Sequence, residues 1–281
     1  MRRITASLIF MLGLAVAAAN LTLPGNPKSV KLAVIGDGGT GETPQYEVGQ
    51  QMADYHTKFP FDFVLMLGDN IYGHQSAGDF RKKFEDPYKA LLSQGVKFYA
   101  SLGNHDSTTE RMYKPFNMDG KRYYDFKKGD AEFFALDSNY MDPEQLDWLT
   151  KELSSSNSKW KVCFFHHPLY SDGRMHGPDL DLRKQLEPIF EQYGVNVVLA
   201  GHEHFYERTQ PHNGIAYFVL GNSGQLRPHN VRTSPDVAKA FDTDQAFALL
   251  EIDPDQLYYQ IISRTGETVD SGSVTQAKVT R

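Results

Sequence analysis

The stretch that decides the fold is Phe63-Val-Leu-Met-Leu-Gly-Asp69-Asn70-Ile71-Tyr72-Gly73, an apolar run that stops at a glycine, a carboxylate and, three residues later, a phenol. An apolar run of this length bounded by glycine predicts a strand covered on both faces, as in a parallel sheet flanked by helices. Such sheets carry their chemistry just beyond the carboxyl ends of the strands, because the chain leaves the sheet there. Asp69 is therefore expected at a functional site.

The same arrangement, an apolar strand followed at once by polar side chains that can bind a metal, recurs in four other places. The other strand ends carry Asp37 (residues 31–37), Asn104, His105 and Asp106 (97–106), His166 and His167 (161–168), and His202, Glu203 and His204 (195–204). Only the strand before His166 lacks the glycine. We interpret the five strand ends as parts of one site.

The first 19 residues have the composition of a signal peptide. A basic start, Met1-Arg2-Arg3, precedes an apolar run from Leu8 to Ala19, whose last residues are small enough for a signal peptidase. The predicted organisation is therefore a signal peptide (1–19) and a single catalytic domain (20–281), with the mature protein secreted or periplasmic. An uncleaved anchoring helix is the alternative, and the run is too short to span a bilayer well.

Charge and cysteine content exclude some classes of function. Without Arg2 and Arg3 the chain keeps 27 of its 29 basic residues against 35 acidic ones, a net charge of −8 instead of −6. This balance argues against a nucleic-acid surface. An anionic substrate would need local positive charge, which metal ions can supply. The single Cys163 excludes an internal disulfide, and its apolar strand predicts a buried thiol.

The rest of the pattern alternates helices with strands and ends in short β segments. Four helices are predicted: about 43–58 with Thr43 as N-cap, 77–92 broken at Pro87, Asp142 to Leu153, and 179–193 kinked at Pro188 and ended by Gly194. An antiparallel hairpin is predicted over 123–137. The last β segments are predicted at 215–220, 245–252, 256–263 and 268–274. These last segments suit a second sheet packed on the first.

The donors at the strand ends indicate a hydrolytic metal centre. Oxygen and nitrogen donors without thiolates suit iron, manganese or zinc better than a structural zinc site. Seven donor residues are too many for one metal and suit two metals that share a bridging carboxylate. Two metals about 3.5–4 Å apart would clamp the attacking and leaving oxygens of an in-line displacement at phosphorus.

The five polar strand ends, in this order, resemble the sequence motifs of the calcineurin-like metallophosphoesterases. The presence of Tyr72 after the second of them resembles the purple acid phosphatases within that family. The resemblance runs from about Val34 to Arg208, and the length resembles the small, single-domain branch. It implies an α/β fold: a four-layer α/β/β/α sandwich of two mixed sheets flanked by helices.

Position by position, the resemblance also implies the roles of the site residues. The implied ligands of a ferric ion are Asp37, Asp69, Tyr72 and His204. The implied ligands of a divalent ion (Fe, Zn or Mn) are Asp69, Asn104, His166 and His202. The resemblance implies that His105 and His176 contact phosphate or protonate the leaving group. Asp69 would bridge the two ions. A phenolate favours a trivalent ion over a divalent one. His167 would face away from the metals, since neighbouring strand residues point in opposite directions.

The function implied is a secreted acid phosphatase that hydrolyses small phosphomonoesters by in-line attack of metal-bound hydroxide. No nucleic-acid partner and no membrane span after signal cleavage are expected, and the protein should be a monomer. The loops 107–122 and 223–244 would wall the pocket. Two alternatives stay open: a phosphodiesterase or nucleotide hydrolase on the same centre, and a non-catalytic metal- or phosphate-binding module.

Overall fold

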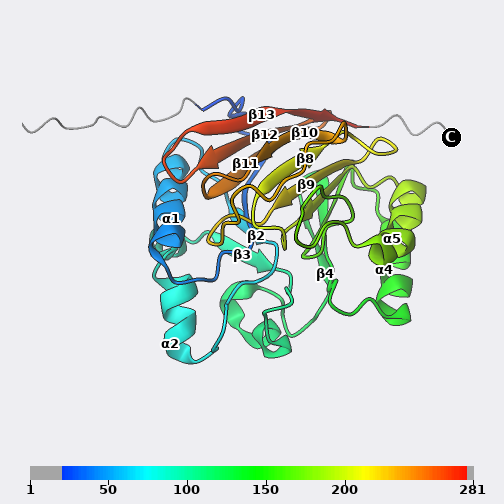
Figure 1. Ribbon diagram of the computed structural model, residues 1–281. Coiled ribbons are helices and arrows are strands. Elements are labelled where there is room, and N and C mark those ends of the chain that lie inside the picture. Colours follow the sequence, from blue (N-terminus) through cyan, green and yellow to red (C-terminus); the bar gives the residue numbers. More distant parts are fainter. Residues whose placement is uncertain (1–20, 277–281) are drawn as a thin grey trace, which may run out of the picture.

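The apolar run before Asp69 forms β2 (Phe63–Met66), in which every residue is buried. In the computed structural model, which describes residues 21–276, β2 pairs in parallel with β1 (Val30–Ile35) and with β3 (Lys97–Ala100) (Figure 1). Three of the five polar strand ends therefore lie side by side. The predicted signal peptide, residues 1–19, lies outside the described residues.

Three strands from the end of the described chain complete this first sheet. Its order is β13-β12-β11-β1-β2-β3, with β11 (Ala246–Ile252), β12 (Gln256–Ser263) and β13 (Thr268–Thr275). β11 pairs antiparallel with β1. The prediction that these three segments belong to a second sheet is wrong: β11 covers the edge of β1, an apolar strand that would otherwise offer unpaired backbone groups, and β12 and β13 extend the same sheet beyond β11.

The second sheet contains the strands that carry the histidines. Its order is β10-β8-β9-β7-β6-β5-β4, with β4 (Tyr124–Lys128), β5 (Ala131–Ala135), β6 (Trp160–Phe165), β7 (Val197–Ala200), β8 (Tyr206–Thr209), β9 (Ala216–Leu220) and β10 (Val237–Phe241). The predicted hairpin is confirmed as β4 and β5. β8 and β10 were not predicted, because both are short and carry charged residues such as Arg208 and Lys239.

Helices flank the two sheets, so the predicted four-layer architecture is confirmed. Figure 1 shows α1 (Thr43–His56) and α2 (Ala77–Phe80) on one flank and α4 (Pro143–Ser155) and α5 (Leu180–Tyr193) on the other. Apolar side chains of α4 and α5 pack against those of the second sheet, among them Leu149, Leu153, Leu186 and Phe190 against Phe134 and Phe165. Cys163 is buried in this cluster, as predicted.

The helix ends follow the local sequence closely. Asp142 caps α4 by accepting a hydrogen bond from Gln145 N (2.8 Å), and Gly194 ends α5 with a φ of 69°. The segment 77–92 is broken as predicted: α2 passes into a π-helical turn, Arg81–Glu85, and resumes as α3 (Lys89–Ser93) after Pro87. α1 begins at Thr43 itself, with Glu42 rather than Thr43 in the capping position.

The loop after β3 folds into two short 3-10 turns, Thr108–Met112 and Lys114–Phe116. α5 continues through Pro188. Among residues 21–276, no helix has the length and apolar character needed to cross a bilayer.

Candidate metal centre

The five polar strand ends meet where the parallel strands of both sheets stop. Asp37 N donates to Gly68 O (3.1 Å) and Gly201 N donates to His166 O (3.0 Å), which joins neighbouring ends within each sheet. His202 N donates to Asp37 Oδ2 (2.8 Å) and so joins the two sheets. The cluster brings together all seven residues predicted as metal ligands: Asp37, Asp69, Tyr72, Asn104, His166, His202 and His204.

Three of these residues have a left-handed backbone. The φ angles are 53° at Asp37, 52° at Asp69 and 69° at His202. A residue other than glycine costs about 1–3 kcal/mol in this region, and such strain gathers at functional sites. The strain redirects each side chain as the chain leaves its strand.

A first donor group consists of Asp37, Tyr72 and His204. Tyr72 Oη lies 3.3 Å from Asp37 Oδ1 and 3.3 Å from His204 Nε2. His204 Nε2 lies 3.4 Å from Asp37 Oδ1. A phenol oxygen, a carboxylate oxygen and an imidazole nitrogen therefore form a triangle with sides of similar length.

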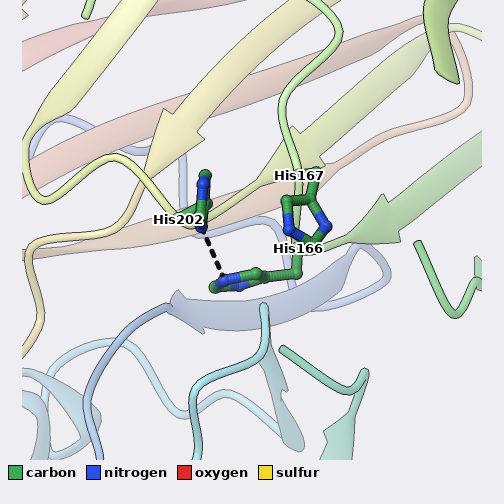
Figure 2. A group of neighbouring side chains, drawn as sticks. All are labelled: His166, His167 and His202. Atoms are coloured by element: carbon green, nitrogen blue, oxygen red, sulfur yellow. Dashed lines mark hydrogen bonds between the residues drawn. The ribbon is translucent and has the colours of Figure 1, made fainter. Parts of the chain in front are cut away.

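A second donor group consists of Asn104, His166 and His202. Asn104 Oδ1 lies 2.9 Å from His166 Nε2 and 3.0 Å from His202 Nδ1. The two imidazole nitrogens are 3.1 Å apart, as the dashed line in Figure 2 shows. Three donor atoms again face a common point.

The hydrogen-bonding chemistry of the second donor group fits a bound cation. His166 Nδ1 lies 2.9 Å from Leu67 O, and because a carbonyl only accepts, Nδ1 must carry the hydrogen. The neutral ring then presents a lone pair at Nε2 to the Asn104 oxygen, which also only accepts. Two acceptors in contact repel each other unless a cation lies between them, and a backbone carbonyl behind a histidine is a common support for a metal ligand.

Asp69 lies between the two donor groups. Its side chain is almost fully buried, and Oδ1 lies 3.5 Å from His166 Nε2. Ligand atoms of Asp37, Asp69 and His166 all lie within 4.8 Å of one another. Oδ1 also accepts a hydrogen bond from His105 N (2.9 Å). Asp69 therefore lies near donors of both groups, and its role as a bridging carboxylate stays a prediction.

Burial shifts the pKa values of the imidazoles and of the Asp37 carboxyl group in opposite directions. Burial, followed by the charge of Asp69, raises the pKa of Asp37 well above its usual value. Burial lowers the pKa of His202 to about 2 and of His204 to about 4, and holds that of His166 well below its usual value. The imidazoles are therefore neutral, the form that binds metals, whereas the raised pKa of Asp37 reflects a buried carboxyl group without a countercharge, which a bound cation would supply.

His167 lies nearer the centre than predicted. Its ring centroid is 4.5 Å from that of His202, and Figure 2 shows it beside His166. The alternation of strand side chains does not extend to this residue, because β6 ends at Phe165. Its Nδ1 lies 2.9 Å from Ser138 Oγ. A hydroxyl therefore contacts His167, and ligand atoms of His166, His167 and His202 all lie within 4.8 Å of one another.

His105 and His176 approach the centre from different loops. The ring centroid of His105 lies 4.9 Å from that of Tyr72, in the first donor group. The ring centroid of His176 lies 4.4 Å from that of His202, in the second. Both side chains are exposed, so both are accessible to a substrate bound at the centre.

Two further carboxylates at the strand ends, Asp106 and Glu203, were given no role in the sequence analysis. Asp106 accepts hydrogen bonds from Asn70 N (2.7 Å) and Gly103 N (2.8 Å), and so ties the loop after β2 to the loop after β3. Glu203, between two histidines, is fully buried. The signal available for both was a charged residue inside an apolar strand end, which must find partners to be buried.

The pKa of Glu110 leads to a prediction about pH and stability. Burial, and then the nearby charge of Asp106, raises the pKa of Glu110 to about 10, against 4.5 ordinarily. The folded metal-free protein therefore holds a proton that the unfolded chain releases. This contribution is complete below the unfolded pKa and is lost as pH rises towards 10. Between pH 7.5 and 8.5 the contribution of Glu110 to the free energy of unfolding should fall by about 1 kcal/mol.

Urea unfolding of chelator-treated protein at both pH values measures this slope. Glu110→Gln should make the fall in unfolding free energy between the two pH values smaller, whereas the same change at the exposed Glu144 should leave it unchanged. Equal slopes in the original protein and in Glu110→Gln would show that Glu110 is ionised in the fold.

A family model and the similar proteins of known name point to the same family of phosphoesterases. The model of the family "Calcineurin-like phosphoesterase" matches residues 30–206, a range that contains all seven predicted ligands. Tartrate-resistant acid phosphatase type 5 of Mus musculus and of Homo sapiens are 29% and 30% identical over 133 residues, which cover 44% of this chain and 40% of each relative. The matched stretch thus spans less than half the length of these relatives.

Solved structures share the fold over most of the chain. The purple acid phosphatase PPD1 from yellow lupin covers 90% of this chain, which covers 55% of it, at a TM-score of 0.74 and 18% identity. The alignment with GAP50, described as the anchor in the inner membrane complex of Plasmodium, includes 89% of this chain and 90% of GAP50. The TM-score is 0.76 and the identity is 17%. At these identities the likeness shows the fold alone.

Proposed function

Because the chain belongs to the calcineurin-like phosphoesterase family, we propose that it is a two-metal phosphatase that hydrolyses phosphomonoesters. The observation that carries this proposal is the pair of three-atom donor groups, with Asp69 between them. A structural metal site would need only one such group and no accessible imidazoles beside it. The similarity to proteins named tartrate-resistant acid phosphatases supports the proposal of phosphatase activity.

The two donor groups differ in a way that suits two different ions. The first group, with the phenol of Tyr72, would hold Fe³⁺, because a phenolate is a hard anionic donor. The second group, with the neutral amide of Asn104, would hold a divalent ion such as Fe, Zn or Mn. When bound, the metals would supply positive charge for phosphate oxygens and lower the pKa of a water molecule.

The side chains around the centre have separate tasks in this proposal. His105 and His176, on different sides of the centre, would contact the phosphate, and either can give a proton to the departing oxygen. Neither is needed to hold a metal, since each donor group is complete without it. His105 is also anchored through its backbone N–H to Asp69 Oδ1, which fixes its position relative to the metals.

A cleft beside Asn104 suits a substrate whose leaving group is organic and carries no second phosphate. Its volume is about 420 Å³, and its lining includes Arg122, Asn139 and the exposed ring of Tyr140. Arg122 is bound by Asp137 (2.9 Å) and by a second carboxylate, that of the α4 cap (2.7 Å). Because its charge is already neutralised, the cleft suits a neutral or aromatic group.

The remaining parts of the proposal concern where the protein works. We place it outside the cytoplasm, secreted or periplasmic, because residues 1–19 have the composition of a signal peptide. We expect a monomer that acts on small phosphoesters, not on nucleic acid.

Tyr72→Phe tests the iron assignment. Elemental analysis of the purified protein should find two metal ions per chain, and the visible spectrum should contain a phenolate-to-iron charge-transfer band. Tyr72→Phe should remove this band, because the only change is loss of the hydroxyl that faces Asp37 and His204. Tyr46→Phe, on the surface of α1, is the matched control and should keep the band. If the original protein stays colourless after iron loading, the assignment of iron is wrong and zinc or manganese takes its place in the proposal.

A panel of mono- and diesters tests the reaction class with the same preparation. Faster hydrolysis of diesters or nucleotides would assign the centre to that substrate class instead. A metal-loaded protein inert towards every aryl phosphate would make it a non-catalytic binding module.

A further inference from the structure

Glu203 is a fully buried carboxylate between two proposed metal ligands. Its neighbours in sequence, His202 and His204, face different donor groups. Burial of a carboxylate is unfavourable unless hydrogen bonds replace its water. The partners of Glu203 therefore indicate why this residue is tolerated at the centre.

Both oxygens of Glu203 bind other loops. Oε1 accepts hydrogen bonds from the backbone N–H groups of His176 (3.1 Å) and Gly177 (2.6 Å). Oε2 accepts one from Asn230 Nδ2 (3.0 Å) and lies 3.8 Å from Arg227 Nη1. The Glu203 carboxylate thus accepts hydrogen bonds from two loops: the one that carries His176 and the one after β9.

These two loops form a single unit over the carboxylate. Gly173 and Val231 form an antiparallel bridge, and Arg174 N donates to Asn230 O (2.8 Å). A Cβ added to Gly173 would lie 2.0 Å from Glu203 Oε1, so the backbone approaches the carboxylate as closely as only glycine allows. The paired loops are fitted to Glu203 rather than merely near it.

We propose that Glu203 is a positioning residue that holds the backbone of His176, so that its imidazole faces the metal centre beside His202. This inference rests on the proposed phosphatase function only for the role of His176 in turnover. Without the carboxylate, the N–H groups of His176 and Gly177 would be left without their acceptor, and water would compete for them. The loop would then be free to move the imidazole away from the substrate.

Amide hydrogen exchange tests the contact without any metal or substrate. In metal-free Glu203→Ala, exchange at His176 and Gly177 should be faster by about tenfold or more, since hydrogen bonds to charged groups are strong. Glu203→Gln keeps an oxygen acceptor and should restore most of the protection. Gly173→Ala should also accelerate exchange, because its methyl displaces the carboxylate.

The matched control is Glu251, another fully buried glutamate that binds a loop far along the chain from the centre. Its carboxylate accepts hydrogen bonds from Gly25 N (2.7 Å) and Asn26 N (2.6 Å). Glu251→Ala should leave exchange at His176 unchanged, together with kcat and metal content. Unchanged exchange at His176 in both Glu203→Ala and Gly173→Ala would overturn the proposal.

A double-mutant cycle with His176→Ala tests the consequence for turnover. With both metals bound, Glu203→Ala should lower kcat about tenfold in the original protein and less than twofold in the His176→Ala background. A loss of equal size in both backgrounds, or a loss of metal, would show that Glu203 acts through the metal ligands. If the original protein hydrolyses no ester, the proposed function fails, while the exchange experiment still decides the positioning of His176.

Discussion

Replacing Asp69 by asparagine is expected to remove both metals and to lower hydrolysis by at least about a thousandfold. Asp69 lies between the two donor groups, with Oδ1 3.5 Å from His166 Nε2. Asparagine has nearly the same shape but only one oxygen and no charge, so it cannot bridge two cations. Metal ions stabilise the transition state of phosphoryl transfer by several kcal/mol, and each 1.4 kcal/mol corresponds to a factor of ten in rate.

Elemental analysis and turnover of an aryl phosphate measure this effect together. Asp62→Asn is the matched control, because Asp62 is an exposed aspartate just before β2, at the opposite end of the same strand. It should keep both metals and normal turnover. An Asp69→Asn protein that still turns over substrate with two metals bound would exclude Asp69 as the bridge.

Gly103→Ala is expected to damage the centre although glycine supplies no ligand. A Cβ at Gly103 would lie 2.2 Å from Asp69 Oδ1 and 2.3 Å from Asp69 N, and Gly103 N is already bound to Asp106 Oδ2 (2.8 Å). Neither backbone can move freely, so Asp69 must shift. A displacement of about 1 Å at a reacting centre can cost about a hundredfold in rate, and overpacking a core costs about 1–3 kcal/mol.

Metal content, kcat and thermal stability of Gly103→Ala should therefore all fall. Gly78→Ala in α2 is the control: its Cβ would meet only Ser76 Oγ, at an ordinary 3.6 Å, and alanine favours a helix. A Gly103→Ala protein with full metal content and turnover would mean that the loop after β3 yields without moving Asp69.

The parts of the molecule that were predictable are those encoded in short stretches of sequence. Asp69 and Asn104 follow apolar strands directly, so their place at one edge of a parallel sheet follows from local pattern alone. The caps at Asp142 and Gly194 are equally local. The two donor groups contain residues that the family resemblance assigned to the two ions, and the roles of these residues as ligands stay predictions.

What escaped prediction depends on contacts between distant segments. The partners of Glu203 lie 27 residues away in either direction, in loops without a recognisable pattern. The sheet to which β11 belongs is decided by which strand has a free apolar edge, and both sheets offer short β segments of similar composition. The orientation predicted for His167 was wrong because strand alternation was extended two residues beyond the end of β6.

The pairing of β1 with β11 has a consequence for how the protein folds. Leu32 lies opposite Leu250, so these partners are separated by more than two hundred positions. Contacts of such high sequence separation must bear the entropy of closing a very long loop, and they form slowly. During synthesis every proposed ligand leaves the ribosome before β11 does. The strand that carries Asp37 therefore lacks this neighbour until β11 has been synthesised, and the centre should assemble only after that point.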